Sequence, residues 1–430
     1  MPDQLTVLLA GRRAATLDQG PGGTLTLTYD DEWRTSAGAT PLSLSMPLAA
    51  KNYSGRIVHA FCQGLLPDNE RVLERWGRDF HVSAGNPFAL LRHVGEDCAG
   101  AVQFVRPERL AGLLDNEGGV RPLTDERIAE RLRTLRGDPA AWHLAGTGQF
   151  SLAGAQAKTA LHWDATSDRW GDPYGAVPTT HILKPAIAGL DDHDLNEHLC
   201  LAAASRAGMH MATSRVTAFG AERAIVVDRF DRLPGPGGTV TRVHQEDLCQ
   251  ALGVPPSQKY QSEGGPTPEQ IIELLRRAAQ PSAVAESDVG KFVDALALNW
   301  LIAGTDAHAK NYSVLMAPGQ VRLAPLYDVA SSLPYEDMYR PRLRLAMKIG
   351  SEYRVDAIGA RHWAAFADRN GLHPDQVLGR VDELARRLPD AFRVAARDEA
   401  VLALGSDLPD RLADRVSQHV KRCRAALATD

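Results

Sequence analysis

Three polar side chains late in the chain have the types and the order that phosphoryl transfer uses. Asp306 and Asn311 stand five positions apart in GTDAHAKNYSVL (304–315), and Asp328 follows in LAPLYDVASS. A carboxylate beside an acceptor hydroxyl can orient it and accept its proton, and an amide oxygen and a second carboxylate are hard ligands suited to Mg²⁺. Asp, Asn and Asp in this order are typical of protein-kinase-like chemistry. The stretch 304–315 is therefore predicted to be a catalytic loop.

Each of these residues taken singly also has an ordinary structural role open to it. Asp306 could cap a helix, Asn311 could support a turn, and Asp328 could be a solvated loop acid. All three together, in order and between apolar segments, favour the chemical interpretation over three separate structural ones.

Two upstream segments have residues that could hold phosphates. Lys184 ends the β-type run THILKP, where an ammonium can lie against phosphates, although a lysine stem packed at a strand end is the alternative. In GTGQFSLAGAQAKTAL (146–161), small residues would let backbone N–H groups approach a triphosphate. This is not a Walker A loop, because Ala157 stands where that motif needs Gly before Lys158.

The elements that must position these groups change in type along the chain. LTVLLAG, the turn QGPGG and TLTLTYD predict a hairpin, and NERVLERW, NPFALLRHV and 124–136 predict helices. Between about 146 and 230, short strands (KTALHW, THILKP, RVTAFG, RAIVVDRFDR) surround the helical LNEHLCLAAASRAGM. After about 240 the pattern is almost entirely helical, so the chain is expected to be an α+β protein.

Composition narrows the class of protein. The 430 residues allow two or three domains. Five scattered cysteines without a CxxC pair fit the reduced thiols of a cytoplasmic protein. No apolar run approaches the roughly 20 residues of a membrane span, and the N-terminus lacks the basic region of a secretion signal. A net charge of −5 argues against a chain that binds nucleic acid alone by bulk electrostatics.

A set of motifs gives the chain a family resemblance. In order, they are PLSLSMPL, FCQGLLPDNERVLERW, FSLAGAQAKTAL, HILKP, NEHLCLAAASRAGM, VVDRFDR, HQEDLCQALG, NWLIAGTDAHAKNYSVL and LAPLYDVASS. Together, over nearly the whole chain, they resemble the HipA family, the serine/threonine kinase toxins of bacterial type II toxin–antitoxin modules. The resemblance implies a two-lobed protein-kinase-like fold. Its expected parts are a β-rich N-terminal domain (1–110), a kinase N-lobe-like region (111–235) and an all-helical C-lobe (236–430).

The resemblance also implies roles for single residues. Asp306 would be the catalytic base, Asn311 and Asp328 would bind Mg²⁺, and Lys184 would hold ATP phosphates. The implied nucleotide-site residues are Ala153, Gly154, Ala155, Gln156, Ala157 and Lys158 of a phosphate loop, Asp228, Arg229 and Phe230 of a hinge facing adenine, and His308, Ala309, Lys310, Asn311, Tyr327 and Asp328. The family often has Glu in place of Asp228, which is a conservative difference. Ser151 matches the family's autophosphorylated serine, although a strand-end serine is the simpler interpretation of that residue alone.

The function that the resemblance implies is an ATP- and Mg²⁺-dependent serine/threonine protein kinase that acts as a growth-inhibiting toxin. Its substrate would be a protein, with an aminoacyl-tRNA synthetase as the class that the resemblance implies, and a phosphate on Ser151 would expel the phosphate loop and end activity. The implied partners are a HipB-like helix-turn-helix antitoxin and, through it, operator DNA. Two alternatives remain open: a weakly catalytic antitoxin-binding co-repressor, and a small-molecule kinase on the same scaffold.

Overall fold

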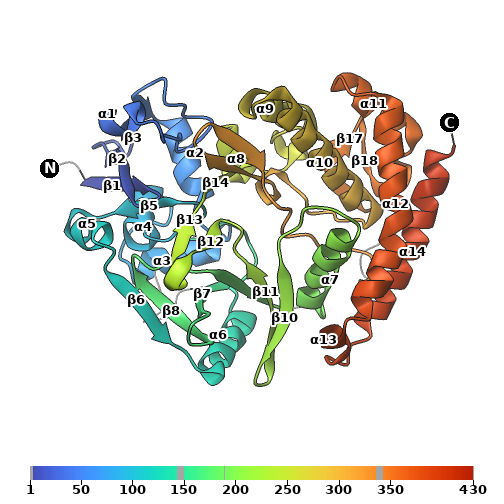
Figure 1. Ribbon diagram of the computed structural model, residues 1–430, viewed down its shortest axis with the longest axis horizontal. Helices are drawn as coiled ribbons and strands as arrows, with labels where there is room; N and C mark the ends of the chain where they lie inside the picture. Colours follow the sequence, from blue (N-terminus) through green and yellow to red (C-terminus); the bar gives the residue numbers. More distant parts are fainter. Residues whose placement is uncertain (1–2, 143–149, 188, 336–341, 430) are drawn as a thin grey trace. The chain divides into compact units, whose positions relative to one another are not determined.

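The computed structural model describes residues 3–142, 150–187, 189–335 and 342–429, and these fall into two compact units. Unit 1 comprises Met1–Pro185, Thr217–Ser257 and Ser313–Val321, and unit 2 comprises Ala186–Val216, Gln258–Tyr312 and Arg322–Asp430. Both units are discontinuous in sequence. The expected α+β class is confirmed by the mixture of elements (Figure 1), whereas the expected boundaries at 110 and 235 stay a prediction.

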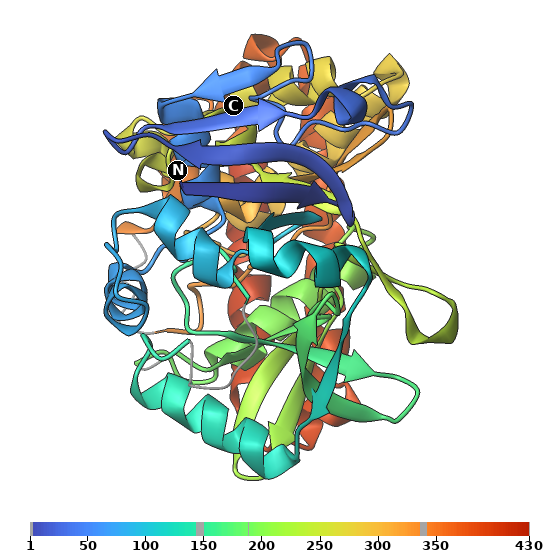
Figure 2. The same cartoon turned by 90° about the vertical axis from the view of Figure 1, so that its left-hand side faces the viewer.

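A five-stranded sheet begins unit 1. Its strand order is β4-β3-β2-β1-β5, from the elements β1 (Asp3–Leu9), β2 (Arg12–Gln19), β3 (Leu25–Tyr29), β4 (Asn52–Ser54) and β5 (Val102–Val105). Neighbouring strands are antiparallel, and Figure 2 shows the blue strands of this sheet edge to edge. β3 alternates buried and half-buried residues, as a strand with one face on the core should. The QGPGG turn does close a hairpin, as predicted, but it joins β2 to β3. β1 pairs with β2, a strand that was not predicted.

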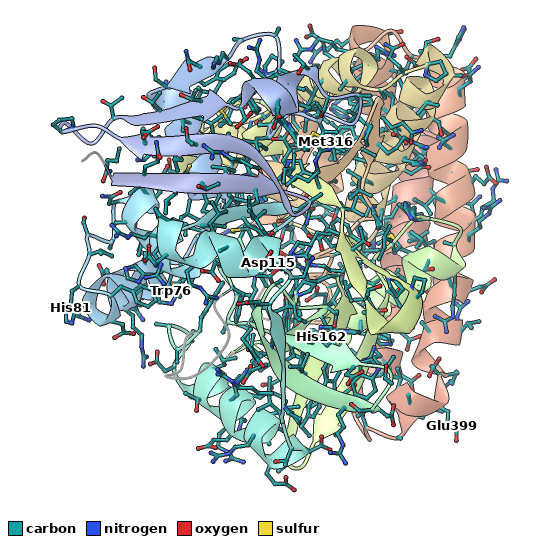
Figure 3. The ribbon with its side chains drawn as sticks, turned by 60° about the vertical axis from the view of Figure 1, so that its left-hand side comes forward. Trp76, His81, Asp115, His162, Met316 and Glu399 are labelled. Atoms are coloured by element: carbon teal, nitrogen blue, oxygen red, sulfur yellow. The ribbon has the colours of Figure 1, made fainter. Side chains whose placement is uncertain are left out.

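The helices of this N-terminal region pack against the sheet and supply its core. They are α1 (Asp31–Thr35), α2 (Arg56–Gly64), α3 (Glu70–Asp79), α4 (Pro87–Val94) and α5 (Pro107–Leu114). Asn69 and Asn86 cap α3 and α4 by accepting backbone N–H groups, which explains where these helices begin. Trp76 of α3, labelled in Figure 3, is fully buried in the hydrophobic core of this region.

The second sheet of unit 1 has six strands in the order β10-β11-β9-β7-β8-β6. They are β6 (Gly118–Pro122), β7 (Thr159–Asp164), β8 (Arg169–Gly175), β9 (His181–Pro185), β10 (Ser214–Phe219) and β11 (Glu222–Asp228). Helix α6 (Asp125–Gly137) packs on β9 and β11, and its buried Ile128 and Leu132 share a core with Leu183 and Val226. This core fixes the end of β9, where Lys184 lies.

Shorter strands complete unit 1. β12 (Arg232–Pro234) pairs with β13 (Val240–Arg242), and β14 (His244–Asp247) leads into α8 (Leu248–Ala251). β14 also pairs with β15 (Ser313–Ala317), which precedes β16 (Gln320–Leu323), so the strand after the predicted catalytic loop belongs to a sheet with β14.

Unit 2 is mainly helical. Its helices are α7 (His193–Arg206), α9 (Pro268–Ala278), α10 (Ser282–Leu301), α11 (Ala360–Arg369), α12 (Pro374–Ala396), α13 (Glu399–Leu402) and α14 (Leu408–Leu427). α12 packs on α7, α10, α11 and α14, and Figure 1 shows α11, α12 and α14 as the orange and red helices. Trp300 and Trp363 lie against each other, with ring centroids 5.8 Å apart, inside this bundle.

The sequence predicted an all-helical region after residue 235, and that prediction is wrong. It contains β13 to β16 and the hairpin β17 (Arg344–Ile349) with β18 (Glu352–Arg354). In the described part of the chain, no helix is long and apolar enough to cross a membrane.

Candidate active site

The predicted catalytic loop begins where α10 ends, in unit 2. Ala303 takes a left-handed conformation (φ 50°), and a Cβ on Gly304 would stand 2.3 Å from the side-chain oxygen of Asn299. Only glycine fits so close an approach, so Gly304, directly before Thr305, determines where the chain leaves α10. The loop then presents Asp306 at the surface while the residues from His308 onward are buried.

The carboxylate of Asp306 is held by a residue that the sequence analysis missed. The Tyr260 hydroxyl donates a hydrogen bond to Asp306 Oδ1, with an O···O distance of 2.5 Å. Thr305 and Ser332 hydroxyls are 2.9 Å apart, which ties the start of the loop to the segment after Asp328. Asp306 is thus exposed enough to meet a substrate and has a defined orientation.

Asn311 is joined to the same loop through its side-chain amide. Its Nδ2 donates to the backbone carbonyl of Asp306 at 2.8 Å, and the backbone N–H of His308 donates to the same carbonyl at 2.8 Å. Because the nitrogen of the amide is used within the loop, the oxygen is the atom that can serve as a metal ligand.

Asp328 lies on a segment that is bonded to this loop. The hydroxyl of the preceding Tyr327 donates to the backbone carbonyl of Lys310 at 2.8 Å. Asp328 has a left-handed backbone (φ 57°), a conformation that Asp tolerates better than most residues and that occurs at functional sites. An amide oxygen at Asn311 and a carboxylate at Asp328 form a hard-oxygen donor set, which fits Mg²⁺.

The other loop residues that the resemblance singled out are buried. His308 is 4% and Lys310 5% exposed. The His308 ring meets the edge or face of Tyr260 with centroids 4.9 Å apart. The N–H of Ala309 donates to the carbonyl of Lys259 at 3.3 Å. These contacts hold the loop against the 258–263 segment, so His308 and Tyr260 both position Asp306.

The predicted phosphate loop lies in unit 1 and closes on its own lysine. Lys158 Nζ donates to the carbonyl of Ala153 at 2.6 Å and lies 5.2 Å from the ring centroid of Trp142. Gly154 has φ 107°, and a Cβ there would stand 2.5 Å from Lys158 Nζ. The small residue at this position therefore lets the Lys158 side chain approach the backbone. The sequence alone could not predict this contact.

Hydrogen bonds anchor this loop to neighbouring segments. The carbonyl of Gly154 accepts from the N–H of Asp68 at 3.0 Å, and the Gln156 amide donates to the carbonyl of Pro185 at 3.3 Å. The latter bond brings the phosphate loop to the end of β9, directly after Lys184, which is 6% exposed. Ala155 accepts a bond from Asn69, and Ala157 packs at the edge of the N-terminal core.

The predicted hinge follows β11 and has an unexpected electrostatic role. Asp228 lies 3.1 Å from His181 on β9. Arg229 is buried and bonds Asp231 at 2.8 Å, with Asp97 3.6 Å away. The Arg229 guanidinium is thus engaged in this ion cluster. A nucleotide would therefore contact the backbone of Asp228, Arg229 and Phe230 rather than the guanidinium of Arg229.

The same cluster shifts the pKa of Asp97. Burial acts to raise it, but Arg232, Arg229 and Arg242 outweigh burial and hold the pKa of Asp97 at about 2. Asp97 also accepts from the Thr179 hydroxyl at 2.7 Å. The carboxylate is therefore charged at any physiological pH and joins the N-terminal region to the hinge.

Ser151 is fully buried. Its hydroxyl donates to the carbonyl of Leu65 at 2.8 Å, and its N–H donates to the carbonyl of Asp97 at 2.9 Å. In this arrangement the hydroxyl oxygen cannot be reached by a phosphoryl donor.

The candidate residues form two groups. The first comprises Ser151, the phosphate loop, Lys184 and the hinge in unit 1, and the second comprises Asp306, the residues 308–311, Tyr327 and Asp328 in unit 2. Within each group, hydrogen bonds join segments that are distant in sequence. Tyr260 is the residue of this site that could not be found from the sequence, because it stands in a polar segment 46 residues before its partner Asp306.

Comparisons with known proteins identify the family of this chain. The HipA-like C-terminal domain matches residues 150–392, and the HipA N-terminal domain matches residues 5–105. A Sinorhizobium fredii protein named "Putative kinase Y4mE" is 34% identical over 426 residues, which cover 98% of this chain and 99% of that protein. The serine/threonine-protein kinase toxin HipA of Shewanella oneidensis is 33% identical over 381 residues, 86% of this chain and 83% of that one.

A solved structure extends the likeness to three dimensions. It contains the Shewanella oneidensis toxin–antitoxin system of HipA, HipB and operator DNA, and it matches with a TM-score of 0.81 and 28% identity over 99% of this chain and 100% of that chain. The resemblance inferred from the motifs is therefore confirmed: the chain belongs to the HipA family.

Proposed function

We propose that this protein is an ATP- and Mg²⁺-dependent serine/threonine protein kinase that acts as a growth-inhibiting toxin. The observation that carries the proposal is the loop in which the Asn311 amide donates to the Asp306 carbonyl at 2.8 Å, bonded through Tyr327 to the segment that carries Asp328. The names of the relatives, one a serine/threonine-protein kinase toxin, support the same reaction class. Loops that hold an acid, an amide and a second acid in this order are typical of protein kinases.

Each candidate residue has its own role in the proposed reaction. Asp306 orients the substrate hydroxyl and accepts its proton, and Tyr260 holds that carboxylate in place. Asn311 and Asp328 would hold Mg²⁺, which supplies charge neutralisation at the phosphates. Lys184 and the N–H groups of the phosphate loop would meet the nucleotide's phosphates, for which Lys158 must release the carbonyl of Ala153.

Ser151 fits a self-inactivating role because of where its hydroxyl lies. Transfer of the γ-phosphoryl group to Oγ breaks a bond to ADP and forms a Ser151 phosphoester, while the hydroxyl proton passes to a base such as Asp306. The hydroxyl must first leave the carbonyl of Leu65, and the phosphorylated residue cannot return to a fully buried site. The phosphate loop that follows would then be displaced, which ends nucleotide binding.

The partners follow from the relatives. The Shewanella structure holds a HipA with HipB and operator DNA, so we expect this chain to bind a HipB-like antitoxin and to reach DNA through it. Its net charge of −5 agrees with an indirect route to DNA. The expected substrate is a protein, with an aminoacyl-tRNA synthetase as the leading class.

A growth assay tests the proposed function in cells. Induced expression of the wild-type chain should arrest growth, and Asp306→Asn should not, because that change removes the base at an exposed position. Asp368→Asn, at an exposed position on α11, is the matched control and should arrest growth like the wild type. Arrest by Asp306→Asn at equal protein level would contradict the kinase mechanism.

A further inference from the structure

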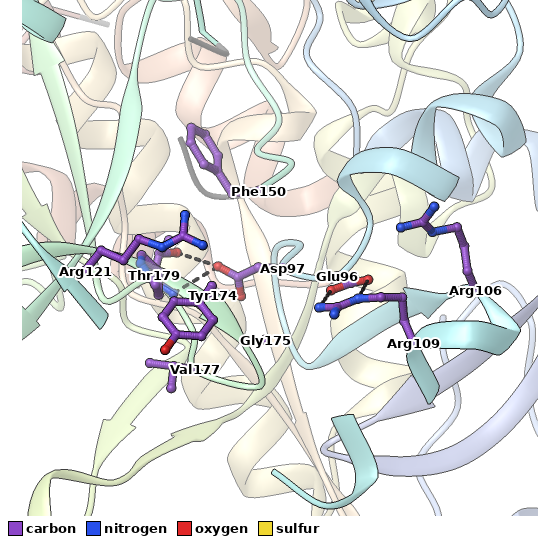
Figure 4. Close-up of a pocket in the computed structure, with 11 residues that line it drawn as sticks. Glu96, Asp97, Arg106, Arg109, Arg121, Phe150, Tyr174, Gly175, Val177 and Thr179 are labelled. Atoms are coloured by element: carbon purple, nitrogen blue, oxygen red, sulfur yellow. Dashed lines mark hydrogen bonds and ion pairs between the residues drawn. The ribbon is translucent and has the colours of Figure 1, made fainter. Parts of the chain in front are cut away.

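Unit 1 contains a pocket of about 370 Å³ whose walls come from the N-terminal region and from the six-stranded sheet. Arg106 and Arg109 at the start of α5 form one side, and Arg121 of β6 with Tyr174 of β8 form the other (Figure 4). None of these four belongs to the candidate active site. Three guanidinium groups therefore line one pocket.

The two acids that line the pocket are already neutralised. Glu96 receives two hydrogen bonds from Arg109, both at 3.1 Å. Asp97 is bonded by the buried Arg232 at 2.9 Å and by Arg242 at 3.3 Å. Their charge therefore does not cancel that of the remaining arginines in the wall.

Within the ranges that the structure describes, Arg121 has no acid to balance its charge, and Arg106 is paired only with an exposed acid. Arg106 lies 3.4 Å from the exposed Glu108 and has no closer acid in the described part of the chain. Arg121 has no carboxylate partner among the described residues, and its guanidinium lies 4.9 Å from the ring centroid of Tyr174. Figure 4 shows these two side chains on opposite sides of the pocket, with the neutralised Asp97 and Glu96 between them. Arg106 is also the N-cap of α5 and makes no side-chain cap, which adds the helix dipole to the positive field.

The chemistry of this pair selects an anion with several acceptor oxygens. Arg106 and Arg121 line the same pocket, and an anion bound there would be attracted by both charges. A guanidinium fork matches the oxygens of a phosphate, and the pocket volume exceeds that of a bare phosphate. Tyr174 and Phe150 give the remaining space aromatic walls.

We propose that this pocket binds a small phosphomonoester, with the phosphate between Arg106 and Arg121 and the rest of the ligand against Tyr174 and Phe150. Arg121 is exposed, so its guanidinium is accessible to the phosphate, whereas Arg109 is held by Glu96. Because Phe150 directly precedes Ser151, ligand in this pocket would also contact the segment that carries the predicted phosphorylation site.

Titration calorimetry with ribose 5-phosphate tests the proposal, with ribose as the uncharged control. The protein must be shown by mass to carry no phosphate, so that no phosphoserine of the chain competes. Ribose 5-phosphate should bind once per chain and ribose should not. Arg106→Gln and Arg121→Gln should each weaken binding about tenfold or more, since hydrogen bonds to charged groups contribute that much. Arg127→Gln, an exposed arginine of α6 with the same loss of charge, should bind like the wild type.

A second titration, at a saturating concentration of Mg²⁺ and a non-hydrolysable ATP analogue, separates this pocket from the nucleotide site. Binding of ribose 5-phosphate should persist there. The proposal is overturned by no heat of binding at millimolar ligand, by displacement with the ATP analogue, or by equal affinities of the pocket variants and Arg127→Gln.

Discussion

The side-chain nitrogen of Asn311 donates a hydrogen bond to the backbone carbonyl of Asp306 at 2.8 Å. This bond couples the residue expected to accept a proton with a residue expected to bind the metal. It also fixes which atom of the amide can act as a ligand, because a carbonyl can pair only with the N–H side of Asn311. Asparagine is therefore required here for its donor as much as for its acceptor.

Replacing Asn311 with Asp tests this coupling. Asp is a good Mg²⁺ ligand, but it has no N–H and would place a carboxylate against the carbonyl of Asp306. We expect Asn311→Asp to weaken Mg²⁺ activation about 10- to 100-fold, as loss of supporting contacts does at metal sites. Kinase activity measured against Mg²⁺ concentration gives the answer, with the exposed Asn116→Asp as a control. Activation by Mg²⁺ equal to that of the wild type would show that the donor is not needed.

Tyr260 should contribute to the chemical step more than to nucleotide binding. Tyr260→Phe keeps the ring against His308 and removes only the hydroxyl that donates to Asp306. The expected result is a fall in kcat of roughly tenfold, the effect of one lost hydrogen bond to a charged group, with an unchanged KM for ATP. Steady-state kinetics separates the two parameters. A raised KM with unchanged kcat would place Tyr260 in nucleotide binding instead.

Two substitutions at Ser151 should differ in stability. Ser151→Ala removes one buried hydrogen bond and should lower the free energy of unfolding by about 1 kcal/mol. Ser151→Asp places an unpaired carboxylate in a fully buried site and should cost about 3 kcal/mol, or free the segment from its site. Urea unfolding and limited proteolysis distinguish these results, and the exposed Ser54→Asp is the control. Equal stability of the two Ser151 variants would contradict the buried position.

Glu246 should make the protein less stable as pH rises. Burial raises the pKa of this carboxyl to about 8; its Oε1 accepts from the N–H of Leu44 at 2.7 Å, and its Oε2 is buried without a hydrogen-bond partner in the described chain. Between pH 4.5 and 8 the folded state binds more protons at this site than the unfolded state does. The free energy of unfolding should therefore fall with rising pH, by at most roughly 1.4 kcal/mol per pH unit from this group.

Glu246→Gln should flatten that dependence, since it keeps the shape of the neutral carboxyl. Denaturant unfolding at several pH values between 5 and 9 measures the effect, with the exposed Glu273→Gln as the matched control. If the slope of stability against pH is the same in Glu246→Gln as in the wild type, the carboxyl is not protonated in the folded protein.

The local parts of the site could be predicted from the sequence. Asp306 and Asn311 are close in the chain, so their spacing alone indicated a shared loop. The contact of Tyr260 with Asp306 could not be predicted, because a polar segment gives no periodic signal and the two meet only through tertiary packing.

The ion pairs at the hinge could not be predicted from the sequence either. RAIVVDRFDR was predicted to be a strand, and β11 (Glu222–Asp228) covers only the first part of that run. The buried ion cluster that Arg229 forms with Asp97 and Asp231 could not be predicted, because ion pairing between distant residues leaves no local pattern. The short strands β17 and β18 were missed for a related reason: β18 has three residues, too few for a period to be recognised.

The most direct test of the central claim is phosphoryl transfer in vitro. Purified, unphosphorylated protein is incubated with Mg²⁺ and γ-labelled ATP beside Asp306→Asn, and the label is located by peptide mass mapping. The account predicts label on Ser151 in the wild type and none in Asp306→Asn, with similar unfolding temperatures for both proteins. Absence of ATP turnover by the wild type, or equal labelling of the two proteins, would contradict it.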